Sequence, residues 1–162
     1  MKGHSHRRLY AIYLLLLTTF TFLFSTCSTK EKKRFVIGVS QCSEDVWREK
    51  LNEELRIAAL YYDNVKLDIK SANDDVKMQT QQIDAFVNEN VDLLIVAPGQ
   101  VSISPAIDRA YEKGIPVIIF DRRTRSDKYT AYIGADNRSI GSAMGRYLAS
   151  VGEGDVVELC GL

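Results

Sequence analysis

The chain has 162 residues, with 21 basic and 21 acidic side chains and a formal net charge of zero. Its two histidines are His4 and His6, so no imidazole after residue 6 can serve a nucleophile pair or a metal site. Beyond the first 27 residues, 18 basic side chains stand against 21 acidic ones, a net charge of −3. This balance argues against nucleic acid as a partner, and we expect no metal site.

Residues 1–29 have the pattern of an export segment. Three basic residues lie within residues 2–8, and 21 uncharged residues, 9–29, follow them. This uncharged stretch just reaches the roughly 20 residues that span a bilayer, so a cleaved signal peptide and a membrane anchor both remain open. The charged residues 30–34 form a spacer before the body. We therefore expect the body to be periplasmic and tethered to a membrane through residues 1–29.

Lipidation of Cys27 is a third alternative for residues 1–29. It follows Leu23-Phe24-Ser25-Thr26, which loosely resembles a bacterial lipobox, in which a small residue precedes a cysteine that becomes lipidated. Thr26 is larger than the residue usual at that position. Lipidation of Cys27 is thus an alternative to cleavage without lipid and to an uncleaved anchor.

From residue 34 onward, apolar runs of strand length alternate with segments of helical period. We expect strands at 34–40, 65–70, 92–97, 116–121, 131–134 and 155–160, and helices at 45–62, 75–89, 103–113 and 137–150. This alternation predicts an α/β fold, a doubly wound parallel sheet with helices on both faces. The third strand is apolar on both faces, which predicts a central position in the sheet.

Side-chain spacing predicts how the helices begin and which face they bury. In the first helix, Val46, Leu51 and Leu55 recur on one face, which we expect to pack, while Arg48 and Glu49 fall on the face expected to be solvated. Asp75 is placed to cap the second helix.

The loop after the first strand tests for nucleotide chemistry. It carries Gly38 and then Ser40-Gln41-Cys42-Ser43-Glu44, without the glycine patterns that bring backbone amides to phosphates. No pair of carboxylates or serine–histidine arrangement suggests catalysis. We therefore expect no cofactor and no catalytic residues, and a binding protein rather than an enzyme.

The fourth expected strand ends at a pair of opposite charges. Asp121 and Arg122 directly follow the apolar run Pro116–Phe120, and parallel α/β sheets bind ligands outside the carboxyl ends of their strands. A carboxylate and a guanidinium together offer the acceptors and donors that vicinal sugar hydroxyls require. In the alternative reading, Asp121 caps a loop and Arg122 is solvated.

Four segments, taken in order, resemble one family. They are Phe35–Ser40, Val91–Pro98, Gly114–Arg122, and Ile133–Asn137 followed by Gly141. Together they resemble the amino-terminal lobe of type I periplasmic binding proteins, the ribose-binding-like family that shares its fold with the core of lactose-repressor-type regulators. The resemblance implies a lobe at 35–153 and, at 154–162, the start of a second lobe that is cut short.

The resemblance also implies roles for individual residues. Asp121 and Arg122 would hydrogen-bond the sugar. The loop after the first strand would add polar contacts and a stacking ring, from Ser40, Gln41, Glu44 and Trp47. Two of these have simpler explanations, since Trp47 can cover the start of the first helix and Glu44 can favour the amino terminus of that helix.

Other positions concern the hinge and the identity of the ligand. Asp136 and Asn137 resemble a turn near the cleft and hinge, although capping of the helix at 137–150 is sufficient to explain them. Ala97 and Val46 depart from the ribose-binding pattern. We therefore expect a pentose or hexose of open identity.

The resemblance implies an exported monosaccharide-binding module. One partner would be the permease of an ABC transporter. The alternative is the periplasmic sensor region of a hybrid histidine kinase, with the kinase modules in a longer parent chain. Because family members hold the sugar between two lobes, these 162 residues carry half of the expected contacts.

Overall fold

The computed structural model describes residues 10, 13–14, 33–152 and 154–158, and the chain divides into a unit at 1–33 and a unit at 34–162. Apart from residues 10 and 13–14, the predicted export segment lies outside the described residues, and so does Cys27. In the described part of the chain, no helix is long and apolar enough to cross a membrane. The fold below concerns the second unit.

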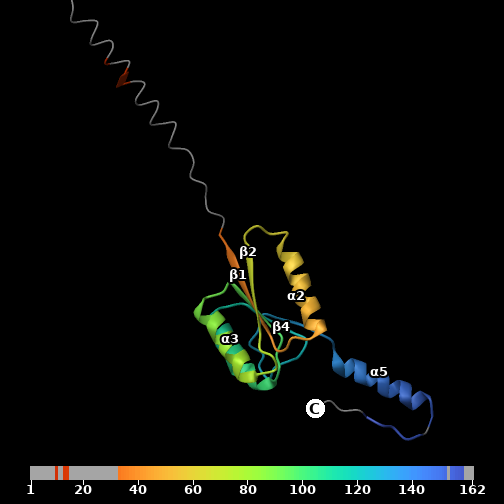
Figure 1. Ribbon diagram of the computed structural model, residues 1–162. Helices are drawn as coiled ribbons and strands as arrows, with labels where there is room; N and C mark the ends of the chain where they lie inside the picture. The colour runs from red at the N-terminus through yellow and green to blue at the C-terminus, as the bar shows by residue number, and fades with distance from the viewer. Residues whose placement is uncertain (1–9, 11–12, 15–32, 153, 159–162) are drawn as a thin grey trace, which may run out of the picture. The chain divides into compact units, whose positions relative to one another are not determined.

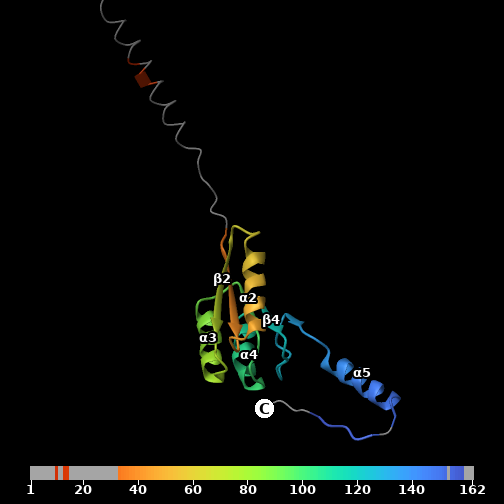
Figure 2. The same cartoon turned by 45° about the vertical axis from the view of Figure 1, so that its right-hand side comes forward.

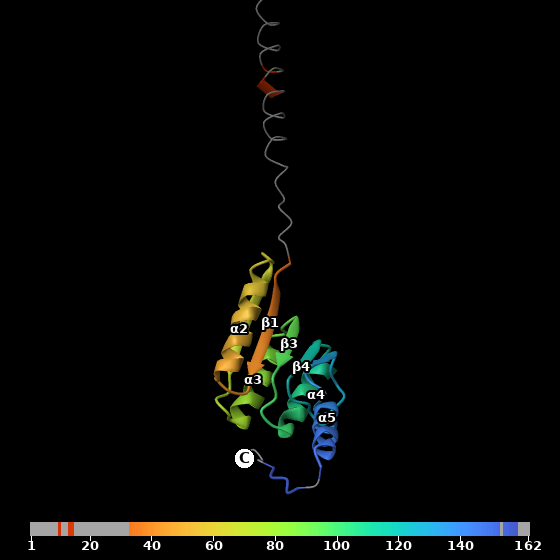
Figure 3. The same ribbon diagram turned by 90° about the vertical axis from the view of Figure 1, so that its right-hand side faces the viewer.

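The second unit is built on a five-stranded parallel sheet with the strand order β2-β1-β3-β4-β5. Its strands are β1 (Phe35–Gln41), β2 (Val65–Ser71), β3 (Leu93–Val96), β4 (Val117–Phe120) and β5 (Ala131–Ile133). Figure 3 shows β1, β3 and β4 following one another across the sheet. The parallel sheet confirms the predicted fold class, and β3 has the predicted central position.

Helices cover the sheet from two sides. Helix α2 (Val46–Ala59) lies on one side of β1 and β2, and α3 (Val76–Asn88) lies on the other (Figure 1). Helix α4 (Ser104–Glu112), entered through a short 3-10 turn at Val101–Ile103, packs beside α3 (Figure 2). Asp75 caps α3 as predicted, because its carboxylate accepts hydrogen bonds from the backbone amides of Lys77 and Met78.

Strands β2 and β3 lie on opposite sides of β1. The chain therefore crosses β1 when it passes from β2 through α3 to β3. The strand order therefore reverses between β1 and β3, and in open parallel sheets the carboxyl ends of the strands at such a point form a crevice. The segments that leave these carboxyl ends are the starts of α2, of the 3-10 turn and of the loop after β4. The topology brings them to one edge of the sheet.

The core lies between the sheet and helices α3 and α4. It contains Phe86, Leu94, Ile107 and Val117, none of which is exposed. The ring of Phe86 packs directly on the backbone of Gly38, where an added Cβ would lie 2.8 Å from Cδ1 of the ring. A side chain at position 38 would thus occupy space that the aromatic ring fills.

Helix α2 buries a different set of side chains from the predicted one. Val46, expected to pack, is 84% exposed, while Arg48, expected to be solvated, is only 6% exposed. Leu51 and Leu55 are half-buried. The prediction was wrong in the first turn because Arg48 finds two carboxylates at the carboxyl edge of the sheet, which hydrophobic period alone does not reveal.

Helix α5 (Asn137–Ser150) begins as predicted at Asp136, whose carboxylate accepts hydrogen bonds from the amides of Arg138 and Ser139. Every residue of this helix is exposed, and a Cβ added at Gly141 or Gly145 would meet open space. The strand expected at 155–160 is not seen in its described part, since residues 154–158 form no strand. A strand draws its hydrogen bonds from a neighbour, and none pairs with these residues in the described structure.

The close contact between Gly38 and the Phe86 ring predicts that a methyl group added at position 38 destabilises the fold. We expect Gly38→Ala to lower the free energy of unfolding by about 1 to 3 kcal/mol, because overpacking a tight core forces side chains and backbone to shift. Urea unfolding followed by far-ultraviolet circular dichroism measures this loss. Gly141→Ala is the matched control, which should be neutral or slightly stabilising; equal effects of the two changes would contradict the packing described here.

Candidate functional site

Side chains from two elements meet at the carboxyl edge of the sheet. Asp121 follows β4, and its Oδ2 lies 3.3 Å from Nη2 of Arg48 in the first turn of α2. The ring of Trp47 stacks on that of Phe120, with centroids 5.4 Å apart and an interplanar angle of 27°. We call Asp45, Trp47, Arg48, Phe120, Asp121 and Arg122 the carboxyl-edge cluster.

Asp121 is held in a left-handed backbone conformation, with φ of 67°. This region is disfavoured for most residues but tolerated by aspartate. Two hydrogen bonds fix it: the Asp121 amide donates to the carbonyl of Ile133 at 2.8 Å, and the Tyr132 hydroxyl donates to the Asp121 carbonyl at 2.8 Å. The carboxylate faces Arg48 of α2, and the Asp121 side chain stays 39% exposed.

Arg122 is directed toward the loop after β3. Its Nη1 donates to the carbonyl of Gly99 at 3.0 Å. That loop is fixed from beneath by buried Gln79, which accepts from the Gly99 amide at 3.0 Å and donates to the Ala97 carbonyl at 2.9 Å. Asp121 and Arg122 thus take different partners, and both keep exposed surface at the edge of the sheet.

Arg48 is a site residue that sequence reasoning missed. Its Nη1 lies 2.6 Å from Oδ2 of Asp45, and its guanidinium carbon lies 5.6 Å from the centroid of the Trp47 ring. Burial opposes the charge of Arg48, but its interactions with Asp45 and with Cys42 together outweigh burial and raise the pKa of Arg48. The only signal in the sequence was a basic residue three positions after an aspartate at a helix start.

The other predicted polar residues of the first loop divide into two groups. Ser40 and Gln41 are buried, 0% and 1% exposed, and Gln41 Nε2 donates to Oδ1 of Asn52 at 2.7 Å. Ser40 Oγ and Gln41 Oε1 are sealed from solvent and have no hydrogen-bond partner among the described residues. Glu44 is exposed and borders a hollow of about 370 Å³ that is also lined by Glu49, Asn52 and Arg56 of α2.

Asp136 and Asn137 lie at the start of α5 and are exposed. Hydrogen bonds from Ser139, through its hydroxyl and its backbone amide, are the main cause that lowers the pKa of Asp136. The described contacts of Asp136 are those of a helix cap, and none joins it to Asp121 or Trp47. Because β5 runs parallel to β4, with Phe120 opposite Ile133, this helix start follows a strand that ends at the same edge as the carboxyl-edge cluster.

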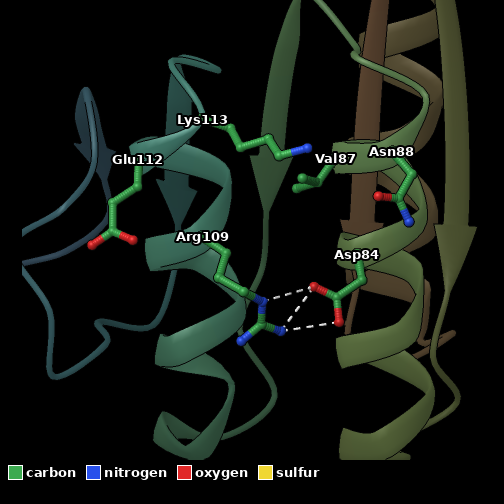
Figure 4. Close-up of a pocket in the computed structure, with 6 residues that line it drawn as sticks. All are labelled: Asp84, Val87, Asn88, Arg109, Glu112 and Lys113. Atoms are coloured by element: carbon green, nitrogen blue, oxygen red, sulfur yellow. Dashed lines mark hydrogen bonds and ion pairs between the residues drawn. The ribbon is translucent and has the colours of Figure 1, made fainter.

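A second hollow, of about 530 Å³, lies between the C-terminal halves of α3 and α4 (Figure 4). The Arg109 guanidinium crosses it and pairs with both carboxylate oxygens of Asp84, at 2.8 and 3.0 Å from Nη2. This hollow lies where the helices end, whereas the cluster lies where the strands end. Its ion pair joins two helices and includes no predicted site residue.

The structure is an α/β lobe whose polar and aromatic side chains gather at the carboxyl edge of a parallel sheet, and the comparison with protein families identifies its class. Residues 35–162 match the model of the periplasmic binding protein domain. The chain belongs to this family. The match includes all strands of the sheet and the whole carboxyl-edge cluster.

Individual relatives carry related names. The D-xylose-binding periplasmic protein of Escherichia coli K12 is 27% identical over 139 residues, 85% of this chain and 42% of that protein. The ribose import binding protein of Bacillus subtilis is 28% identical over 163 residues, 91% of this chain and 53% of that protein. The chain thus spans about half the length of these relatives.

A solved structure gives a higher identity. The fructose-binding periplasmic domain of a hybrid two-component system superposes with a TM-score of 0.68 at 49% identity, covering 73% of this chain and 40% of that one. The periplasmic component of the arabinose ABC transporter of Shewanella sp. ANA-3 superposes with a TM-score of 0.61 at 26% identity, covering 72% and 40%. Transport and sensing are thus both represented among similar proteins.

Because Asp45 caps α2 through its carboxylate, we expect the stability of the fold to depend on pH in the acidic range. Hydrogen bonds from the Arg48 amide and the Ser43 hydroxyl lower the pKa of Asp45 from 3.8 to about 2. A carboxylate with a lowered folded-state pKa stabilises the fold fully above pH 3.8, and this contribution is lost as the pH falls toward 2.

We therefore expect wild-type protein to lose more stability than Asp45→Asn between pH 4 and pH 2, because asparagine caps the helix without titrating. Thermal unfolding at a series of pH values measures the difference. Parallel curves for the two proteins across this range would refute the assignment.

Proposed function

We propose that the chain binds a monosaccharide at the carboxyl-edge cluster. The proposal is carried by one observation: a half-exposed carboxylate, an exposed guanidinium and an exposed indole ring gather at the carboxyl ends of parallel strands in a chain of this family. Asp121 supplies acceptors for sugar hydroxyls and Arg122 supplies donors. This is a binding function, and it requires no bond-making chemistry from the protein.

Trp47 completes the set of contacts. Its ring is 53% exposed while one face stacks on Phe120. The C–H face of a sugar ring packs well on an aromatic surface, and the stack with Phe120 limits the orientations of the indole. The proposal assigns Trp47 to stacking against the sugar, with the carboxylate and guanidinium setting its orientation.

The remaining predicted residues take secondary positions in the proposal. Ser40 and Gln41 are sealed from solvent, so they support the edge from beneath unless ligand binding uncovers their unpaired oxygens. Glu44 is exposed in the loop between β1 and α2, beside the carboxyl-edge cluster. Asp136 and Asn137 lie at the start of α5, at the cleft edge and hinge that the family resemblance implies.

The biological role we propose is that of a periplasmic module that reports or delivers a sugar. The 49% identity to the fructose-binding domain of a hybrid two-component system favours the sensor role, with histidine kinase modules as partners. The relatives named for import favour an ABC transporter permease instead. In either role, the proposal makes residues 1–29 the membrane tether, as an uncleaved anchor or through lipidation of Cys27. Fructose, xylose and ribose are the first ligands to test.

The 162-residue chain is expected to bind its sugar weakly. In two-lobed binding proteins each lobe contributes hydrogen bonds, and every sugar hydroxyl left without its partner forfeits about 1 kcal/mol. We expect a dissociation constant in the millimolar range for one of the three sugars. Titration followed by the indole N–H resonance of Trp47, the single tryptophan, measures it, and a micromolar constant would contradict the picture of half a site.

Two substitutions locate the binding surface. We expect Asp121→Ala to abolish the sugar-induced shift of the Trp47 resonance, because it removes both carboxylate acceptors from the centre of the cluster. Glu44→Ala should reduce the shift only in part. The same titration with each variant compares them, and equal, negligible effects would mean that the sugar binds elsewhere.

A further inference from the structure

Arg48 is a charged residue that is buried at the carboxyl edge of the sheet. Its side chain is 8% exposed, although it belongs to the first turn of a surface helix. Its Nε is sealed from solvent and donates to no acceptor among the described residues. Removing a guanidinium from water and leaving one donor unused both cost free energy, so an apolar side chain of similar length would fit this position at least as well.

The two carboxylates that Arg48 contacts do not need it for their own solvation. The side chain of Asp45 is 46% exposed and that of Asp121 is 39% exposed, so water can hydrate both. Loss of Arg48 would therefore leave no buried, unpaired carboxylate. The strong destabilisation that follows when one partner of a fully buried ion pair is removed does not apply here.

What Arg48 does supply is a defined geometry. It joins the start of α2 to the end of β4, with Nη1 at 2.6 Å from Asp45 and Nη2 at 3.3 Å from Asp121. The same guanidinium lies 5.6 Å from the centroid of the Trp47 ring. One rigid, planar group thus contacts both the carboxylate and the ring that the proposed site presents to a sugar.

We propose that Arg48 is a positioning residue, which fixes the Asp121 carboxylate and the Trp47 ring in their binding orientation from beneath. This inference rests on the proposed sugar-binding function and extends it. Arg48 does not contact the sugar, because it is covered. In this proposal, the buried charge of Arg48 orients the side chains of the site, although its burial lowers the stability of the fold.

The test compares Arg48→Met, Arg48→Lys and wild type in the full chain. Methionine fills the space of the arginine side chain but has neither its charge nor its planar set of hydrogen-bond donors. Lysine keeps the positive charge without that planar set of donors. We expect Arg48→Met to leave the melting temperature unchanged or higher, to weaken the near-ultraviolet circular dichroism of Trp47, and to weaken sugar binding about tenfold, as for loss of a charge-assisted contact. Arg48→Lys should recover part of the binding.

Arg109→Met is the matched control. It also removes an arginine that pairs with an aspartate, but on α4, at the hollow between α3 and α4. We expect it to change neither the Trp47 signal nor sugar binding. The probes are fructose, xylose and ribose, followed by the Trp47 indole resonance.

The possible results separate the two proposals. If Arg48→Met lowers the melting temperature and leaves the Trp47 signal and binding unchanged, Arg48 is structural and the inference is overturned. If no sugar shifts the wild-type resonance while Arg48→Met still alters the Trp47 dichroism, Arg48 positions the ring but the proposed function is wrong. Unchanged dichroism with unchanged binding overturns the inference whatever happens to stability.

Discussion

The contact between Arg48 and Asp121 joins segments 73 residues apart in the chain, and the geometry of the carboxyl edge depends on it. The parallel sheet brings the two segments to one edge, but topology alone does not orient side chains. A buried guanidinium between two exposed carboxylates does so at a cost in free energy. The fold therefore places the candidate site, and in our proposal Arg48 orients its side chains.

Most of the fold could be predicted because its signals are local. Short β-branched runs marked the strands, and Asp75 and Asp136 marked helix starts through their own hydrogen bonds to nearby amides. The predictions failed where the outcome depended on distant partners. Val46 and Arg48 exchanged their expected environments, and residues 154–158 form no strand because a strand requires a neighbour that the local sequence does not provide.

The positions of the candidate site residues were partly predictable for the same reason. Asp121 and Arg122 follow a buried strand, so the rule for parallel sheets placed them correctly at the carboxyl edge. Trp47 reached this edge because the first helix starts there. Arg48 escaped prediction because it contacts the carboxylate of Asp121, which follows β4 and is distant in the sequence. The burial of Ser40 depends on its place in β1 between β2 and β3, which spacing does not encode.

Helix α5 has a consequence for how the chain behaves in solution. Its apolar side chains, among them Ile140, Met144 and Leu148, are 43% to 62% exposed. A helix of 14 residues that buries none of its side chains against the described residues is only marginally stable in water. We therefore expect α5 to unfold first on warming and to exchange its amide hydrogens fastest among the helices. Its exposed apolar side chains should also promote aggregation in concentrated samples.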